Sequence, residues 1–234
     1  MLCRKAKEFL SSPSTAFEKE KKSQLGDAGK YMLVVGFILA LINGIVGAIT
    51  FSFSSAYPGA AFVGGFSFFV AASGFILQFA LTYVFLFVGL SIWSLWLHLW
   101  VYLMGGKGLE KTMKSVYYGE TPSYVFGWIP SLILVGTVMS PTVLSDPASM
   151  VTTLSLLGIA ILISILVGLW SFVITGKGLM KLHGMTCGRA ASSLVLAIII
   201  PLAIILVIGL AIALAFIGMF AGSPDLLAGA FTAI

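Results

Sequence analysis

The chain contains a very long stretch without a charged side chain. No Asp, Glu, Lys or Arg occurs in residues 31–106, and further uncharged runs cover residues 121–145, 147–176 and 190–224. Each run exceeds the roughly 20 apolar residues that a helix needs to cross a hydrocarbon core of about 30 Å. Only 9% of the residues are charged, against about 25% in soluble domains. The sequence therefore predicts an all-α integral membrane protein.

The number of crossings depends on residues 66–104, which would extend about 58 Å as one helix. Two crossings would split the basic residues 7 against 6, whereas one crossing places all 13 Lys and Arg on one side. The positive-inside bias favours a five-helix bundle with a cytoplasmic N-terminus and an outer C-terminus. Tilt, a re-entrant start near residues 60–66 or an inward protrusion would absorb the excess length. The expected helices are 31–53, 70–104, 121–140, 149–175 and 190–219.

Residues 1–30 are predicted to form a cytoplasmic basic leader, followed by a transmembrane domain in residues 31–234. The leader mixes Phe9, Phe17 and Leu25 with lysines and glutamates. This mixture is typical of an amphipathic segment on the inner membrane surface, started by Ser12 and Pro13. A solvated leader is the alternative.

A glycine and lysine motif occurs twice, because residues 106–111 match residues 176–181 at five of six positions. Both copies follow an apolar segment, so their glycines are predicted to cap helix C-termini. The cations would then lie at the negative end of each helix dipole. The second copy lacks the glycine and hydroxyl positions of a phosphate-binding P-loop. Alternatively, Lys177, Lys181 and Arg189 around His183 would bind a lipid phosphate headgroup.

A second polar segment covers residues 116–130. Thr121 is predicted to cap the third helix, with Pro122 in its first turn and Pro130 interrupting it. Glu120 is predicted to pair with Arg189 or Lys181, which would lock the two inner loops into one surface.

Few polar side chains lie deep in the predicted spans, namely Asn43, Gln78 and His98, and no carboxylate lies there. The two histidines and two cysteines lack metal-ligand spacing. We therefore expect no enzyme, no cofactor and no metal site. Small residues on the first two helices, such as Gly44 and Gly47, are predicted to allow close helix packing.

Three short motifs resemble the Yip family of Ypt-interacting multi-pass proteins, especially its archaeal members. The motifs are Tyr118-Gly119-Glu120-Thr121-Pro122, then Gly127-Trp128-Ile129-Pro130, then the stretch from Leu182 through His183-Gly184 to Arg189-Ala190. The resemblance implies a five-helix bundle with a cytoplasmic N-terminus. In eukaryotic relatives it implies vesicle traffic through Rab-type GTPases. The eukaryotic Asp-Leu-Tyr-Gly-Pro signature is absent, since the leader offers only Gln24-Leu25-Gly26-Asp27.

The leading hypothesis is a non-enzymatic multi-pass protein, in the cell membrane if prokaryotic, that organises or shapes the bilayer or docks cytoplasmic partners through its basic inner face. The expected partners are the bilayer with anionic headgroups and a cytoplasmic protein. A homo-oligomer is compatible with the small residues, and nucleic acid is not expected. A small transporter or channel for an apolar or lipid-like solute, lined by Asn43, Gln78 and His98, is the alternative. An enzyme acting on lipid headgroups with His183 as base is a third hypothesis.

Overall fold

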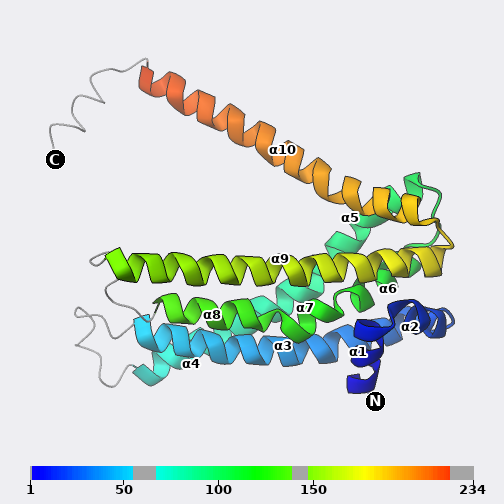
Figure 1. Cartoon of the computed structure of the whole chain (residues 1–234), viewed down its shortest axis with the longest axis horizontal. Coiled ribbons are helices and arrows are strands. Elements are labelled where there is room, and N and C mark those ends of the chain that lie inside the picture. Colours follow the sequence, from blue (N-terminus) through cyan, green and yellow to red (C-terminus); the bar gives the residue numbers. More distant parts are fainter. Residues whose placement is uncertain (1, 55–66, 139–146, 222–234) are drawn as a thin grey trace.

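The computed structural model describes residues 2–54, 67–138 and 147–221, and these residues form an all-helical assembly (Figure 1). Four of the described helical stretches are long and apolar enough to cross a membrane. They are Leu25–Thr50, Phe69–Leu103, Met150–His183 and Cys187–Ala215. This architecture confirms the predicted all-α, multi-pass class.

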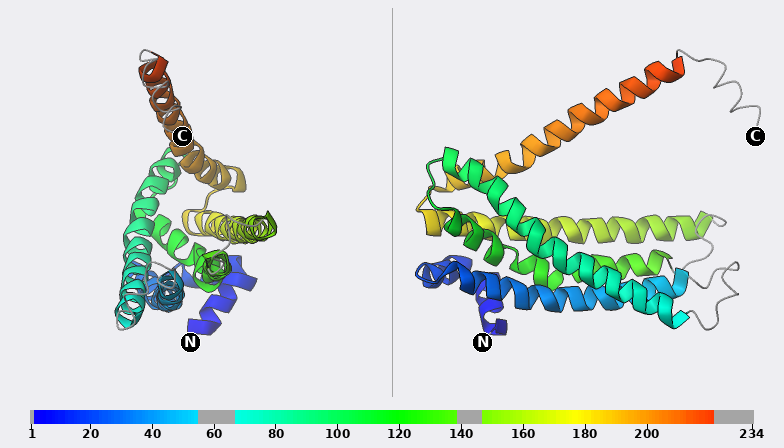
Figure 2. Two further views of the ribbon diagram at one scale, coloured as in Figure 1. Left: turned by 90° about the vertical axis from the view of Figure 1, so that its left-hand side faces the viewer. Right: turned by 180° about the vertical axis from the view of Figure 1, so that it is seen from behind.

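The first two long helices pack against each other. Helix α3 (Leu25–Ser54) begins six residues before the predicted start at residue 31. Helix α4 (Ser67–Val84) continues through a π-helical turn, η1 (Phe85–Gly89), into α5 (Leu90–Leu103). The long apolar block is therefore one continuous helical element within its described residues, which runs obliquely past α3 (Figure 2). The proposed re-entrant start at residues 60–66 lies outside the described residues.

Glycines allow α3 and α4 to approach closely, as predicted. A Cβ atom at Gly47 would lie 2.9 Å from the carbonyl oxygen of Gly74, and one at Gly44 would lie 2.9 Å from the Phe75 ring. Only a residue without a side chain can approach a neighbouring helix this closely. Packing within the bundle thus explains these small residues.

The third element is a broken helix, as predicted, but its breaks lie at Glu120 and Gly127 and not at Pro130. Helices α6 (Leu109–Gly119), α7 (Thr121–Phe126) and α8 (Trp128–Val138) follow one another, separated only by Glu120 and Gly127. Pro130 lies in the first turn of α8, where a missing N–H group costs nothing, and so does not interrupt a helix. Residues 109–119, expected to be loop, pack as α6 against α3, α5 and α9.

The last two helices are longer than predicted at the ends that face each other. Helix α9 (Pro147–His183) and helix α10 (Cys187–Ala221) are joined by only three residues. Gly176 and Gly178 lie inside α9, so the prediction that they cap this helix was wrong. The left-handed residue at its end is Gly184, with φ of +68°. Helix α10 contacts α5 and α9 through its first half and then diverges from them (Figure 1).

The equivalent cap after α5 is shifted by one residue from the predicted glycine pair. Gly105 has φ of +90°, and the N–H of Gly106 donates to the carbonyl of Val101 at 2.8 Å. This is the hydrogen-bond pattern of a Schellman cap. Gly108, also left-handed, precedes α6 instead of ending α5.

The leader packs its apolar residues against the bundle. It forms α1 (Leu2–Ser11) and α2 (Pro13–Glu20), which pack against the end of the bundle. Phe9 and Phe17 are fully buried in the same core as Tyr31, Tyr118 and Leu179. The apolar face of the leader is therefore used for packing within the protein.

Candidate functional site at the leader end

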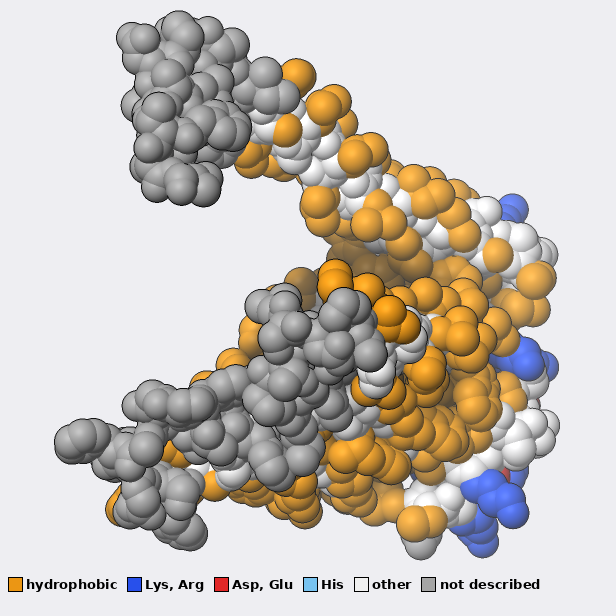
Figure 3. All heavy atoms as spheres, turned by 60° about the vertical axis from the view of Figure 1, so that its left-hand side comes forward, with side chains coloured by type: hydrophobic (Ala, Val, Ile, Leu, Met, Phe, Trp, Pro, Cys, Tyr) orange, Lys and Arg blue, Asp and Glu red, His pale blue; other side chains and the backbone are white. Residues whose placement is uncertain are grey.

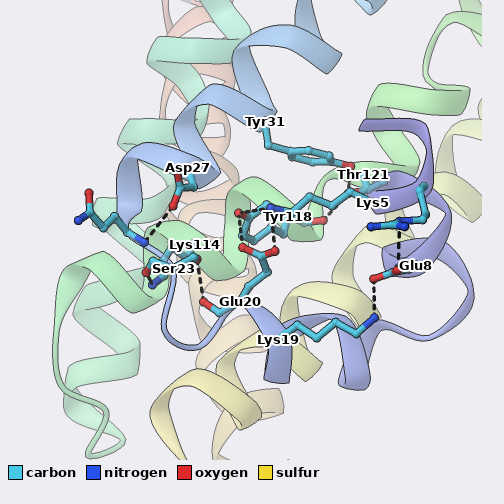
Figure 4. Close-up of polar contacts among 12 residues, drawn as sticks. Lys5, Glu8, Lys19, Glu20, Ser23, Asp27, Tyr31, Lys114, Tyr118 and Thr121 are labelled. Carbon is cyan, nitrogen blue, oxygen red and sulfur yellow. Dashed lines mark hydrogen bonds and ion pairs between the residues drawn. The ribbon is translucent and has the colours of Figure 1, made fainter. Parts of the chain in front are cut away.

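A partly buried polar cluster fastens the leader to the bundle (Figure 4). Lys5 of α1 lies 2.8 Å from Glu20 Oε1 of α2 and donates to the Tyr118 hydroxyl at 3.0 Å. Tyr118 in turn donates to Glu20 Oε2 at 2.9 Å. The Lys5 ammonium also lies 4.7 Å from the centroid of the Tyr118 ring. Three segments far apart in sequence thus share one charge-assisted network, which we call the leader clasp (Lys5, Glu20 and Tyr118).

Electrostatics keep the clasp in one protonation state. Burial alone would raise the pKa of Glu20, but the bonds from Lys5 and Tyr118 hold that pKa below its ordinary value. Burial, followed by the nearby Glu20 charge, raises the pKa of Tyr118 well above its ordinary value. Around neutral pH Glu20 therefore accepts hydrogen bonds as a carboxylate, and Tyr118 donates as a neutral phenol.

Aromatic rings pack beside the clasp. The Phe9 ring stacks on Tyr118 with centroids 4.5 Å apart, and it meets Phe17 edge-on at 5.0 Å. Tyr31 shares a hydrogen bond of 3.0 Å with Thr121, whose hydroxyl donates to the Tyr118 carbonyl at 2.6 Å. Thr121 is therefore the first residue of α7 and bonds backwards, so its predicted role as a capping side chain was wrong.

The junction between leader and α3 is attached to α6. Buried Lys114 donates to the Ser23 carbonyl and lies 3.6 Å from Glu110. Glu110 accepts a hydrogen bond of 3.1 Å from the Leu25 backbone N–H. Helix α6 begins within the first copy of the glycine and lysine motif, which includes Glu110, so this motif supplies part of the attachment of the leader.

Two motif glycines provide room for close packing. A Cβ atom at Gly178 would lie 2.7 Å from Phe17 Cζ, and one at Gly119 would lie 2.9 Å from the Thr175 Cα. Gly178 therefore accommodates the leader, and Gly119 brings α6 onto α9. Sequence reasoning assigned Gly178 to a helix C-cap, because a glycine at a helix end and one at a helix contact look alike in a single sequence.

The predicted pairing of Glu120 with Arg189 or Lys181 is not formed. Lys181 instead lies 3.6 Å from Glu18 of the leader, and exposed Arg189 forms no ion pair with any described residue. Glu120 lies at the break between α6 and α7, where it accepts a hydrogen bond of 2.7 Å from Ser123. Ser123 is also 3.0 Å from Ser171 of α9. Because α6 packs as a helix against α3, α5 and α9, Glu120 at its C-terminus does not pair with the exposed cations Lys181 and Arg189.

The two histidines of the chain meet at one threonine. His98 Nδ1 and His183 Nε2 lie 2.9 Å and 3.1 Å from the Thr112 hydroxyl, which is fully buried. His183 Nδ1 is buried without a hydrogen-bond partner among the described residues. Sequence reasoning treated these residues separately. His98 is 14 residues and His183 is 71 residues away from Thr112, and no local sequence pattern links residues so far apart.

The remaining predicted residues are dispersed. Asn43 is buried in α3, and its side-chain oxygen has no partner within the described part of the chain. Gln78 packs on Gly47, and no described hydrogen bond joins Asn43, Gln78 and His98. Trp128 donates to the Val125 carbonyl at 2.8 Å across the break at Gly127. Buried Pro122 and Pro130 lie in the first turns of α7 and α8, and Lys177 lies partly exposed on α9.

Sequence reasoning missed the leader residues of this site, namely Lys5, Phe9, Phe17 and Glu20. The two phenylalanines were noted as an apolar face, and the burial of that face against the bundle is a tertiary fact. A partly buried lysine and glutamate on separate short helices leave no distinguishing spacing in the sequence.

The long apolar helices and the packed helical leader define a multi-pass α-helical membrane protein. Residues 7–212 match the model of the Yip1 domain, a range that takes in most of the leader and the four apolar spans almost completely. The chain therefore belongs to the Yip1-domain family, whose members are generally non-enzymatic trafficking proteins. No curated protein and no solved structure matches the chain.

Proposed function

We propose that the chain crosses the membrane five times, with the N-terminus cytoplasmic and the C-terminus outside. In addition to the four long spans, the broken element α7–α8 would cross the membrane, as the third crossing in chain order. Its residues 121–138 would extend about 27 Å, close to the hydrocarbon thickness. It lies alongside α3 and α9. The support for its orientation is the grouping of Lys and Arg at the leader end of the molecule (Figure 3).

On this topology the protein is a non-enzymatic membrane protein that organises the bilayer or docks cytoplasmic partners through its leader end. One observation carries the proposal: the leader packs onto the helix ends, so that leader, α6 and α9 present their cations on one surface. The ion pair between Glu18 of α2 and Lys181 of α9, at 3.6 Å, lies on that surface. A composite basic face suits an anionic bilayer surface or an acidic protein partner.

The transporter alternative receives less support. It required Asn43, Gln78 and His98 to line one path, whereas His98 is engaged with Thr112 at the end of α5. A solute flux in proteoliposomes that disappears on altering Gln78 or His98 would restore that alternative.

The decisive experiment is a crosslinking pull-down from native membranes. Wild type is compared with a variant in which Lys177, Lys181 and Arg189 are changed to Gln. The matched control is Lys177→Arg, Lys181→Arg and Arg189→Lys, which keeps every charge. We expect the neutral variant to lose partners, or anionic-liposome binding, that the control retains. An unchanged set of partners and lipids in the neutral variant would leave the basic face with an orienting role only.

Topology is tested separately with the two exposed cysteines, Cys3 and Cys187. A membrane-impermeant maleimide should label both in inverted vesicles and neither in sealed right-side-out cells. Labelling of the two from opposite sides would contradict the five-crossing arrangement.

A further inference from the structure

A groove of about 350 Å³ opens where the broken helix faces η1. Its walls include Leu39, Phe85 and Leu90, and one end is polar, with Glu120, Ser123 and Tyr124. Ligand sites have this composition, mostly apolar with a few placed polar groups, and begin at about 300 Å³. Phe85 is 67% exposed, so the groove is reached from the outer surface of the helices, which in a membrane faces lipid.

The carboxyl group at the polar end lacks a cation. Among the described residues, no Lys or Arg forms an ion pair with Glu120, and its hydrogen-bond partner is the neutral Ser123. Ionisable groups inside helical membrane proteins usually have a counter-ion or a functional ligand.

A second buried polar group lines the same groove. Tyr124 is only 4% exposed, and its hydroxyl has no hydrogen-bond partner among the described residues. An unpaired buried hydroxyl costs about 1–3 kcal/mol. A ligand that orders this end of the groove would offset part of that cost.

The backbone is irregular on both sides of the groove. Glu120 occupies the break between α6 and α7, and three lining residues, Phe85, Leu86 and Gly89, belong to the π-helical turn. Single π-turns occur frequently at functional sites, and broken membrane helices place polar groups at ligand sites. The helix break at Glu120 and the π-helical turn thus line the same groove, and regular helices would pack without either irregularity.

We propose that this groove binds a membrane amphiphile with a protonated amine head. The ammonium group donates to the Glu120 carboxylate beside Ser123 and Tyr124, and the hydrocarbon chain lies along Leu39, Phe85 and Leu90. Charge complementarity selects an amine, since the site offers a carboxyl group without a cation and its remaining walls are mostly apolar. The inference is independent of partner docking at the leader end.

The test uses purified full-length protein in nonionic detergent and three amphiphiles with the same tail: hexadecylamine, hexadecanol and hexadecanoate. At about ten times the dissociation constant, hexadecylamine should raise the melting temperature by roughly 3 °C or more, and the other two should not. Glu120→Gln should abolish the preference for the amine.

Two further variants separate binding from folding. Thr82→Phe fills the groove without touching Glu120 and should also abolish the amine shift. Leu81→Phe, one residue away and outside the lining, should keep it. Equal shifts with the amine and the alcohol in wild type, or an amine shift that persists in Thr82→Phe, would overturn the proposal. Because wild type alone gives the first readout, a poorly folding Glu120→Gln protein would not block the test.

Discussion

Gly178 of α9 lies against the ring of Phe17 in the leader, so close that a Cβ atom there would come within 2.7 Å of Phe17 Cζ. The Phe17 side chain is fully buried. A Cβ atom at Gly178 would also lie 3.0 Å from Ser115 Cβ of α6. A glycine that sequence reasoning assigned to a helix end therefore fixes how the leader meets the bundle.

Gly178→Ala should weaken this contact. Overpacking a close-packed core costs about 1–3 kcal/mol, which exceeds the roughly 0.5–1 kcal/mol that alanine gains over glycine in a helix. The measurement is hydrogen exchange of α1 and α2, which should accelerate. The matched control is Gly168→Ala on the same helix, where a Cβ atom meets nothing within 4 Å. Protection equal to wild type in Gly178→Ala would show that Phe17 shifts without cost.

Lys5→Met should release the leader. The substitution leaves Glu20 without its cation and removes a hydrogen bond to Tyr118. Hydrogen bonds to charged groups contribute about 1.5–3 kcal/mol, so leader opening should rise about 10- to 100-fold. Limited proteolysis between α2 and α3 reports the opening. Lys7→Met, at an exposed position on the same helix, is the control and should cleave like wild type.

Leader docking should weaken in acid. The pKa of Glu20 is lowered in the folded state from an ordinary value of 4.5. A lowered pKa stabilises the folded form above the ordinary value, and this contribution is lost as the pH falls through the lowered value. A fluorophore on Cys3, in a Cys187→Ser background, should report leader release below pH 4.5. Glu20→Gln should lack this step, and an identical step in that variant would assign it to another group.

Thr112→Val should destabilise the junction of α5, α6 and α9. Valine fills the same space but leaves ring nitrogens of His98 and His183 without their shared partner. Each hydrogen bond that the fully buried Thr112 hydroxyl loses should cost about 0.5–1.5 kcal/mol, which thermal unfolding in detergent would detect. Thr112→Ser retains the hydroxyl and should lose less. A loss in Thr112→Val no larger than that in Thr112→Ser would show that the hydrogen bonds to the two imidazoles do not stabilise this junction.

Charge reversal distinguishes the two candidate ion pairs of the leader end. Glu120→Lys combined with Arg189→Glu should show no coupling in a double-mutant cycle, since the two side chains do not pair. Glu18→Lys combined with Lys181→Glu should show a small favourable coupling, up to about 1 kcal/mol, because that pair is solvent-exposed. Rescue of the first pair by the double reversal would contradict the position of Glu120.

Long apolar helices were predictable because hydropathy acts locally. The α9 and α10 segments and the continuous α4–η1–α5 element were all located from uncharged runs. The broken course of α6–α8 was not, since Glu120 is a good helix former and a single glycine such as Gly127 is tolerated inside a helix. The same holds for Gly178, whose neighbour Phe17 lies far away in sequence.

An α-helical membrane protein with its cations at one end could be read from the amino-acid order alone, because transfer of apolar and charged groups between water and lipid depends on composition along the chain. Its Tyr118–Pro122 and Gly127–Pro130 motifs also indicated the Yip1-domain family. The packing of the leader into the core, the network of Lys5, Glu20 and Tyr118, and the position of Glu120 in a groove became visible in the folded chain. Those relationships join residues on different helices, and side-chain packing and hydrogen bonding between distant segments have no local signature.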